Sequence, residues 1–395
     1  MEKLRKLSSA KTSHGLVFIF LIAQQIIGFV FDPYKFVSPY WIAVTLFTIY
    51  LANELRIRIT KENVLPFILF ALCAIGSLAN ILVGSQVAYA FFKIYYSFLG
   101  LVGLLYITKF KINTHVFIPF ILILHVYFYI KYFQYDEGTR LMLDENLFVQ
   151  SSSNTIAMAL NIVLIVYLMV SKAQKENHKW FYLGIALLNL YWISIQGSRA
   201  GILVAFLLVV YTLLNVFGGE QKFKFRFIIS AILIAFLLLY FRIYLFNYAE
   251  DRSMAGVEAY EENVRYFAQS SFFSSLNIEH FILGYPRDFS FIGDQTRTYN
   301  SFLDFWARYG FLPFLFMFFC LFRRFIYQER FSISFLILIP LLAYTPFESL
   351  WGGTLWDILL YIVLFYSYNS SISVRNQQCK KQQKIISYDR FRYEI

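Results

Sequence analysis

An arginine between two long apolar runs is the residue of this sequence best suited to chemistry. Arg199 lies in the segment 194–201 (sequence SIQGSRAG), which separates the apolar stretches 180–197 and 200–217. A guanidinium is permanently charged and presents a planar fork of donors that grips phosphate or carboxylate oxygens at two places. Gly197 and Gly201 allow a tight turn there. The pattern predicts that Arg199 binds an anionic group; an arginine at a helix end that only reaches toward the membrane surface is the alternative.

Further polar residues follow in a second part of the chain. Arg265 stands in a charged stretch, Arg287 closes the turn Leu283-Gly284-Tyr285-Pro286-Arg287, and the segment 298–303 (TYNSFL) leads into another apolar run. Tyr299 and Asn300 are candidates to bind substrate, and Asn300 can equally cap the helix that follows. In this part of the chain, arginines that can bind an anion thus stand near side chains that can form hydrogen bonds.

Other kinds of site lack their sequence signals. No phosphate-binding Gly-x-x-x-x-Gly-Lys loop occurs, and the five histidines are scattered, at positions 14, 115, 125, 178 and 280. Cys73 and Cys320 lie in apolar stretches and Cys379 in a basic tail, which is no pattern for disulfides. We therefore expect neither a metal nor a cofactor.

The composition predicts which elements hold these residues. Of 395 residues, 59% are hydrophobic, 21% aromatic and 15% charged, and the mean hydropathy is +0.57. A soluble protein is usually about 45–50% apolar and about 25% charged. The composition favours an all-α, polytopic integral membrane protein.

Twelve apolar stretches are long enough to be predicted as transmembrane helices. They are 15–31, 37–52, 64–83, 87–107, 115–134, 153–171, 180–197, 200–217, 226–246, 301–322, 332–347 and 354–369. This divides the chain into nine N-terminal spans within 1–246, a large periplasmic loop at 247–300, three C-terminal spans within 301–369, and a cytoplasmic basic tail at 370–395.

The basic residues predict the orientation. With twelve spans, 24 of the 35 lysines and arginines fall on one side, which the positive-inside rule assigns to the cytoplasm together with both termini. This asymmetry accounts for the net charge of +11 without a nucleic-acid partner. On the other side, arginine outnumbers lysine 8 to 3. Because topology needs only positive charge, this arginine bias favours an anionic ligand over ordinary ion pairs.

Two segments on the predicted outer side interrupt the series of apolar stretches. The segment Tyr135 to Ser153 carries several acids and Arg140, and the long loop contains a stretch from Val257 to Leu276 that mixes apolar and charged residues. The spacing in that stretch predicts an amphipathic helix that lies at the membrane surface or caps the bundle. Loops this long are more often binding elements than connections.

Taken in order, these landmarks resemble the O-antigen polymerase and ligase superfamily. The resemblance covers about Arg140 to Phe322. Its motifs are an arginine followed by Ser-Ser-Asn at the start of a span, Gly-Ser-Arg-Ala-Gly between two spans, an external loop with an arginine, Leu-Gly, and Asn-Ser-Phe-Leu before a glycine. In this sequence the residues concerned are Arg140, Asn154, Arg199, Arg265, Leu283, Gly284, Asn300 and Gly310.

The resemblance implies a GT-C-like fold and glycosyl transfer at the periplasmic face of the bacterial inner membrane, without a metal. The implied substrates are sugar chains on undecaprenyl diphosphate, and a chain-length regulator protein is an implied partner. Arg199 and Arg265 would stabilise charge on the lipid diphosphate as it leaves. Arg140, Asn154, Arg287, Tyr299 and Asn300 would bind substrate.

The position before Asn300 is commonly a histidine in the ligases and is Tyr299 here, which favours a polymerase over a ligase. The general base is left open among Asp294, His280 and Glu348. Glu348 lies near the outer end of a span and is included among the catalytic candidates.

Two other classes stay open. An O-antigen ligase would transfer the chain to lipid A-core. A flippase or transporter would place charged residues along a pathway inside the membrane. The charged residues of this chain are instead predicted to gather at one face of the membrane. A structural scaffold would leave the external arginines without a role.

Overall fold

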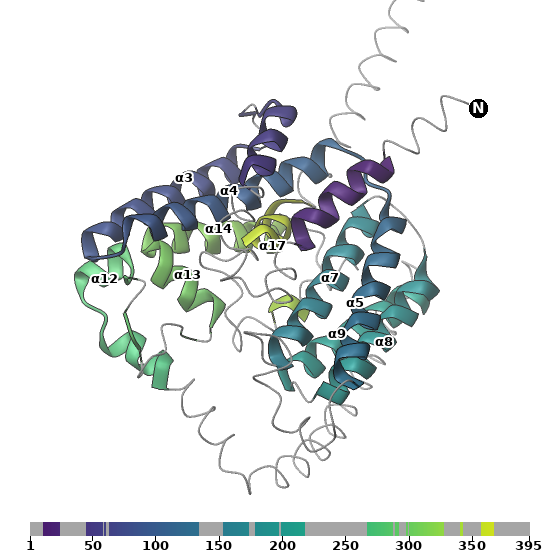
Figure 1. Cartoon of the computed structure of the whole chain (residues 1–395). Coiled ribbons are helices and arrows are strands. Elements are labelled where there is room, and N and C mark those ends of the chain that lie inside the picture. The colour runs from purple at the N-terminus through teal and green to yellow at the C-terminus, as the bar shows by residue number, and fades with distance from the viewer. Residues whose placement is uncertain are drawn as a thin grey trace, which may run out of the picture.

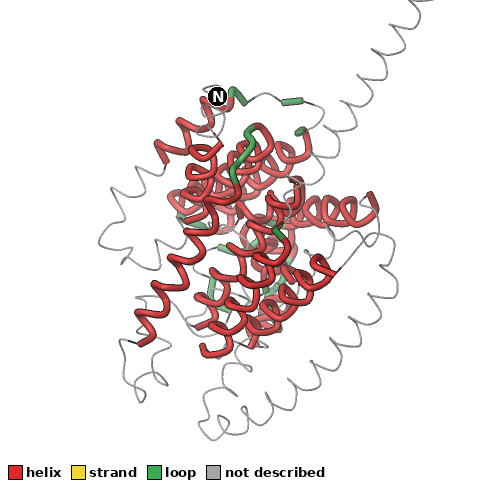
Figure 2. Tube along the Cα trace, turned by 90° about the vertical axis from the view of Figure 1, so that its right-hand side faces the viewer, coloured by secondary structure: helices red, strands yellow, loops and turns green. Residues whose placement is uncertain are grey.

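The computed structural model describes residues 11–23, 45–57, 59–60, 63–133, 153–173, 178–196, 199–217, 267–286, 289–291, 298, 300–327, 340–342 and 357–366. Every regular element within those ranges is a helix, and Figure 2 shows no strand among them. The predicted all-α class is therefore confirmed for this part of the chain. The N-terminal helical segments are Lys11–Ala23 and 45–55.

A helical hairpin forms one side of the molecule. Helix α3(Val64–Ala79) continues into the 3-10 turn η1(Asn80–Val83), and α4(Val87–Lys109) packs back along it (Figure 1). Val64–Val83 and Val87–Lys109 are each long and apolar enough to cross a membrane, by length and composition. They coincide with the predicted spans 64–83 and 87–107.

A second group of helices lies on the other side of the molecule in Figure 1. After the short η2(Thr114–Val116), it consists of α5(Phe117–Phe133), α7(Ser153–Ala173), α8(Lys179–Gln196) and α9(Arg199–Phe217). Helices α7, α8 and α9 contact one another, and α5 packs on α7. These helices agree with the predicted spans 115–134, 153–171, 180–197 and 200–217.

The C-terminal helices complete the hairpin side. Residues 267–274 are helical, followed by α12(Ile278–Leu283), α13(Ser301–Tyr309) and α14(Phe311–Tyr327). The predicted span 301–322 is thus two helices rather than one. Gly310 separates them with a φ of 84°, a left-handed value that ends α13 before α14 begins. Both α13 and α14 pack on α3.

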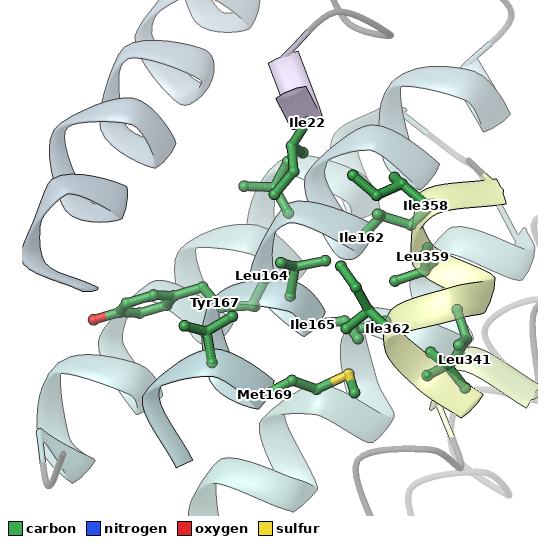
Figure 3. Close-up of a cluster of buried hydrophobic side chains, with 14 of the residues drawn as sticks. Ile22, Ile162, Leu164, Ile165, Tyr167, Met169, Leu341, Ile358, Leu359 and Ile362 are labelled. Atoms are coloured by element: carbon green, nitrogen blue, oxygen red, sulfur yellow. The ribbon is translucent and has the colours of Figure 1, made fainter. Parts of the chain in front are cut away.

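A short helix links the two groups. Helix α17(Asp357–Tyr361) and the π-helical turn η4(Ile362–Tyr366) pack on α4. Figure 3 shows Ile358, Leu359 and Ile362 in the same buried cluster as Ile162 and Ile165 of α7. One hydrophobic core therefore extends through both groups.

Several predictions fall on residues that the structure does not describe. They are the span 226–246, all but 340–342 of the span 332–347, most of the loop Tyr135 to Ser153, and the tail 370–395. In the predicted amphipathic stretch, the described residues 267–274 are helical with Ala268 and Phe272 buried and Phe267 exposed. The predicted apolar face included both Phe267 and Phe272, so only Phe272 is buried as the spacing predicts, and the exposed side also carries the apolar Phe273.

Candidate active site

Helix α13 carries the Asn-to-Gly motif, and the motif residues define its ends. The Asn300 side-chain oxygen accepts hydrogen bonds from the backbone N–H groups of Phe302 at 3.0 Å and Leu303 at 3.2 Å. An asparagine at this position satisfies N–H groups that have no partner within the helix. The capping role of Asn300 is therefore confirmed, while its contact with a substrate stays a prediction.

The Leu-Gly turn lies directly against the C-terminal end of α13. The backbone N–H of Tyr285 donates to the Ala307 carbonyl oxygen at 2.7 Å. Gly284 has a φ of 82°, and a Cβ added there would lie 2.5 Å from the same carbonyl oxygen. Only glycine satisfies both the left-handed backbone and the close approach. Two motifs that are separate in the sequence thus meet in one contact.

A fully buried lysine joins this contact from α4. Lys93 is 0% exposed, and its Nζ donates to the Asn80 side-chain oxygen at 3.1 Å and to the Arg308 carbonyl oxygen at 2.8 Å. The Asn80 side-chain nitrogen in turn donates to the Leu283 carbonyl oxygen at 2.8 Å. Ser85 also donates to Asn80. We call the contact made by Asn80, Lys93, Leu283 and Arg308 the α4–α13 contact.

Two basic side chains are buried here. Arg308 is 5% exposed. The Lys93 Nζ and the Arg308 guanidinium carbon lie 5.0 Å and 5.9 Å from the centroid of the Tyr89 ring, whose π face attracts cations. The Lys93 partners described above are an amide oxygen, a peptide carbonyl and an aromatic ring, none of which carries a negative charge. An anion would be stabilised beside this pair.

A carboxylate lies one helical turn before Arg308. Asp304 is 3% exposed, and its Oδ1 accepts from both the backbone N–H and the hydroxyl of Thr298, each at 2.8 Å. Its second oxygen, Oδ2, is buried and has no hydrogen-bond partner. Residues four apart lie on the same face of a helix, so Asp304 and Arg308 point to one side of α13.

A second buried carboxylate ties α17 to the same region. The Tyr309 hydroxyl lies 2.7 Å from Asp357 Oδ2 and 3.3 Å from the Lys93 carbonyl oxygen, so it can donate to either acceptor. The Ser97 and Tyr361 hydroxyls are 2.7 Å apart. Polar contacts of this kind fix the relative positions of α4, α13 and α17.

The segment around Arg199 is positioned by the other group of helices. Helix α8 ends at Gln196, α9 begins at Arg199, and the two helices pack on each other. The Asn161 side chain donates to the Gly201 carbonyl oxygen at 3.0 Å and accepts from the Asn189 side chain at 2.8 Å. These amides hold the start of α9 against α7 and α8.

The other predicted site residues are only partly placed. Arg140, Arg265, Arg287, Tyr299, Glu348 and Asp294 lie outside the described residues, as do the side chains of Asn154 and Arg199. His280, a candidate base, lies on α12 with its ring stacked on Tyr285, the centroids being 4.5 Å apart. Burial raises the pKa of Tyr285, whose hydroxyl donates to the Phe272 carbonyl oxygen at 2.6 Å.

Four buried residues of this region were not predicted as site residues. Lys93 and Arg308 were counted only among the 11 lysines and arginines on the outer side, and Asp304 and Asp357 were not considered. The signal was available, because each is an ionisable residue inside an apolar stretch and such residues are functional candidates by default.

Comparison with known proteins adds no assignment: the chain matches no family model, and no curated protein or solved structure matches it.

Proposed function

We propose that the chain is a membrane-embedded glycosyltransferase that polymerises repeat units of an O-antigen or a related polysaccharide. The growing glycan on undecaprenyl diphosphate is transferred to the incoming lipid-linked unit at the periplasmic face of the bacterial inner membrane. In this proposal the chain crosses the membrane twelve times, both termini are cytoplasmic, and a chain-length regulator is a partner.

Exposed apolar side chains support the membrane setting. Only 28% of the most apolar 18-residue stretch of Val64–Val83 is buried inside the protein. Ile75 and Leu82 of this helical segment are 62% and 77% exposed. The outer faces of α5 and α14 also carry exposed apolar residues, among them Leu122, Ile123, Val126, Leu312, Leu315 and Phe322. Surfaces of this kind on several helices suit lipid better than water.

The observation that carries the proposal is the pair of buried cations, Lys93 and Arg308. In the twelve-span arrangement Lys93 lies a short distance inside the outer end of its span, and Arg308 is beside it because Lys93 binds its backbone carbonyl. The headgroup of a lipid diphosphate would be held at this depth. A diphosphate concentrates negative charge on few oxygens, and charge-assisted hydrogen bonds to lysine and arginine are among the strongest available to it.

The same pair suits the chemistry of the transfer. As the bond between the anomeric carbon and the diphosphate oxygen breaks, negative charge grows on the leaving group. Lys93, already held in place by Asn80 and by the Arg308 carbonyl, stabilises that charge without having to reorganise, and the neighbouring Arg308 adds to it. Arg199 and Arg265 are proposed to add to this stabilisation, with Arg140, Asn154, Arg287, Tyr299 and Asn300 holding the sugars and Glu348 among the proton-transfer candidates.

The test is complementation of a deletion strain with the wild-type chain, Arg308→Gln or Arg308→Lys. Substitution at this position keeps the backbone carbonyl that Lys93 binds, so Arg308→Gln removes a charge and leaves the Lys93 bond to α13. We expect the deletion strain to make lipopolysaccharide with a single repeat unit, the wild type to restore the ladder of long chains, and Arg308→Gln to restore it at least about 100-fold less well. Membrane abundance of each variant is the control, and Arg308→Lys should recover part of the activity.

Other outcomes would reject a polymerase. Bare core with long chains left on the lipid carrier would identify a ligase. Failure of any repeat unit to reach the periplasm would identify a flippase, the second candidate. The burial of Lys93, Arg308 and Asp357 within apolar stretches is the observation that favours this candidate, because transporters place charges inside the membrane.

A further inference from the structure

The two oxygens of the Asp304 carboxylate have different surroundings. Oδ1 accepts two hydrogen bonds from Thr298, which fixes the chain just before α13. Oδ2 is as deeply buried and accepts none. A buried carboxylate oxygen without a donor is destabilising, and such exceptions in a folded protein call for an explanation.

Asp304 lies in the first turn of α13, where the helix dipole favours a negative charge, but its bonds to Thr298 do not require a carboxylate. An asparagine would accept the same two bonds from Thr298 through its amide oxygen, without burying a negative charge. The Thr298 contacts therefore need one oxygen acceptor and do not need Oδ2. What a carboxylate adds over an amide is a second oxygen that can accept a proton.

The residues around Asp304 suit a role as a proton acceptor. Asp304 and Arg308 are one turn apart on the same face of α13, with Cβ atoms about 5–6 Å apart at this spacing. The Lys93 ammonium is bonded to the backbone of Arg308. The carboxylate of Asp304 and the guanidinium of Arg308 thus lie on the short helix α13, and Lys93 lies on the neighbouring α4. Asn300 and Gly310 cap the two ends of α13.

We propose that Asp304 is the general base of the transfer, a role that rests on the proposed glycosyltransferase function. Oδ2 accepts the proton of the acceptor sugar's hydroxyl group as the oxygen of that hydroxyl forms a bond to the anomeric carbon of the donor. The bond from the anomeric carbon to the diphosphate oxygen breaks, and the diphosphate leaves with the electron pair beside Lys93 and Arg308. The anomeric configuration is inverted, and the aspartic acid then releases its proton to water.

The acceptor class follows from this arrangement. A carboxylate base accepts a proton from a neutral hydroxyl and becomes neutral itself. The negative charge that Lys93 and Arg308 must then stabilise is that of the diphosphate. The ligand at Oδ2 is therefore a neutral sugar hydroxyl of a lipid-linked repeat unit. It differs from the anionic group that Lys93 and Arg308 would bind.

The test compares Asp304→Asn, Asp304→Glu and Thr298→Val in purified full-length protein with a lipid-linked repeat unit as substrate. Chain elongation, donor binding and thermal stability are measured for each. We expect Asp304→Asn to lose about 100-fold or more of its elongation rate while it keeps donor binding and stability. Thr298→Val, which removes one bond to Oδ1, should lose stability and keep its rate within a few-fold.

A pH profile keeps the test decisive if Asp304→Asn does not fold. The wild-type rate should fall at low pH with a slope of one as a single group is protonated, and Asp304→Glu should keep activity with that limb displaced. An Asp304→Asn variant that elongates within twofold of the wild type, or a Glu variant with an unchanged acid limb, would overturn the assignment. If the wild-type protein itself makes no chains, the proposed function fails instead, which is a separate result.

Discussion

The α4–α13 contact and the α7–α8–α9 group bury polar side chains in different ways. In the α7–α8–α9 group, Asn161 and Asn189 are neutral amides that bond to each other, and Asn161 also bonds to a backbone carbonyl, while the side-chain oxygen of Asn189 is buried without a partner. The buried side chains of the α4–α13 contact and its neighbourhood include Lys93, Asp304 and Arg308, which ionise in water. Both regions join helices that the sequence predicts as separate spans.

The difference is one of energy. A buried amide with partners is close to neutral for stability, whereas a buried charge is strongly unfavourable unless it is paired and hydrogen-bonded. Neutral hydrogen bonds would join α4 to α13 at lower cost. Charges retained at such a contact therefore point to function, while the amides of the other region point to assembly and to the placement of Arg199.

The largest expected effect is a loss of elongation rate on substitution in the α4–α13 contact but not in the α7–α8–α9 group. Lys93→Met keeps the length of the side chain and removes the ammonium group together with both of its hydrogen bonds. We expect elongation by the purified protein to fall at least about 100-fold, in line with the loss of one preorganised charge stabiliser. The matched variant Asn189→Leu, in the α7–α8–α9 group, should keep its rate within about threefold. Equal losses in the two variants would contradict the distinction.

The next effect concerns the turn that closes the α4–α13 contact. Gly284→Ala places a methyl group 2.5 Å from the Ala307 carbonyl oxygen on a left-handed backbone. We expect a loss of about 2–3 kcal/mol of stability, measured by thermal unfolding in detergent.

Gly184→Ala is the control for that variant. Gly184 lies within α8, where an added Cβ meets nothing within 4 Å. In a helix interior this change should be neutral or stabilising by up to about 1 kcal/mol. A Gly284→Ala protein as stable as Gly184→Ala would show that the close packing of the Leu-Gly turn on α13 is not maintained.

A smaller effect tests whether the second buried carboxylate is charged. Tyr309→Phe removes a donor to Asp357, and Tyr361→Phe removes the hydroxyl that bonds to Ser97. Hydrogen bonds to charged groups contribute about 1.5–3 kcal/mol and neutral ones about 0.5–1.5 kcal/mol. We expect thermal unfolding to show a larger loss for Tyr309→Phe. Losses of equal size would indicate that Asp357 is protonated in the folded protein.

Much of the fold was predictable from apolar length alone. The helices Val64–Val83, Val87–Lys109 and Arg199–Phe217 begin and end close to the predicted spans, because each is bounded by polar or glycine residues. The break between α13 and α14 was not predicted. Apolar residues continue across Gly310, and hydropathy does not register a change of backbone direction at a single glycine.

The α4–α13 contact was not predicted, for a physical reason. The sequence pattern favoured arginines at the predicted outer surface, whereas the described site is built on residues inside apolar stretches. Lys93 is a single lysine in a long apolar helix, and its partners Asn80 and Arg308 are 13 and 215 residues away in the chain. Such pairs depend on helix packing, which spacing along one segment does not predict. The contact between the Leu-Gly and Asn-to-Gly motifs depends on packing in the same way.

The smallest effect tests the scaffold side of the comparison. Asn161→Leu is similar in volume but removes the donor to Gly201 and the acceptor for Asn189. Hydrogen bonds between helices in membranes contribute about 0.6 kcal/mol on average and rarely more than about 1.7 kcal/mol, so we expect a loss of about 1 kcal/mol in thermal unfolding. The elongation rate should fall only a few-fold, because α9 remains packed on α7 and α8 through apolar side chains. If the rate instead falls as far as in Lys93→Met with stability preserved, the asparagines act through Arg199 at the site itself. The α7–α8–α9 group would then belong to the catalytic machinery, and the neutrality of a buried contact would no longer separate assembly from function in this protein.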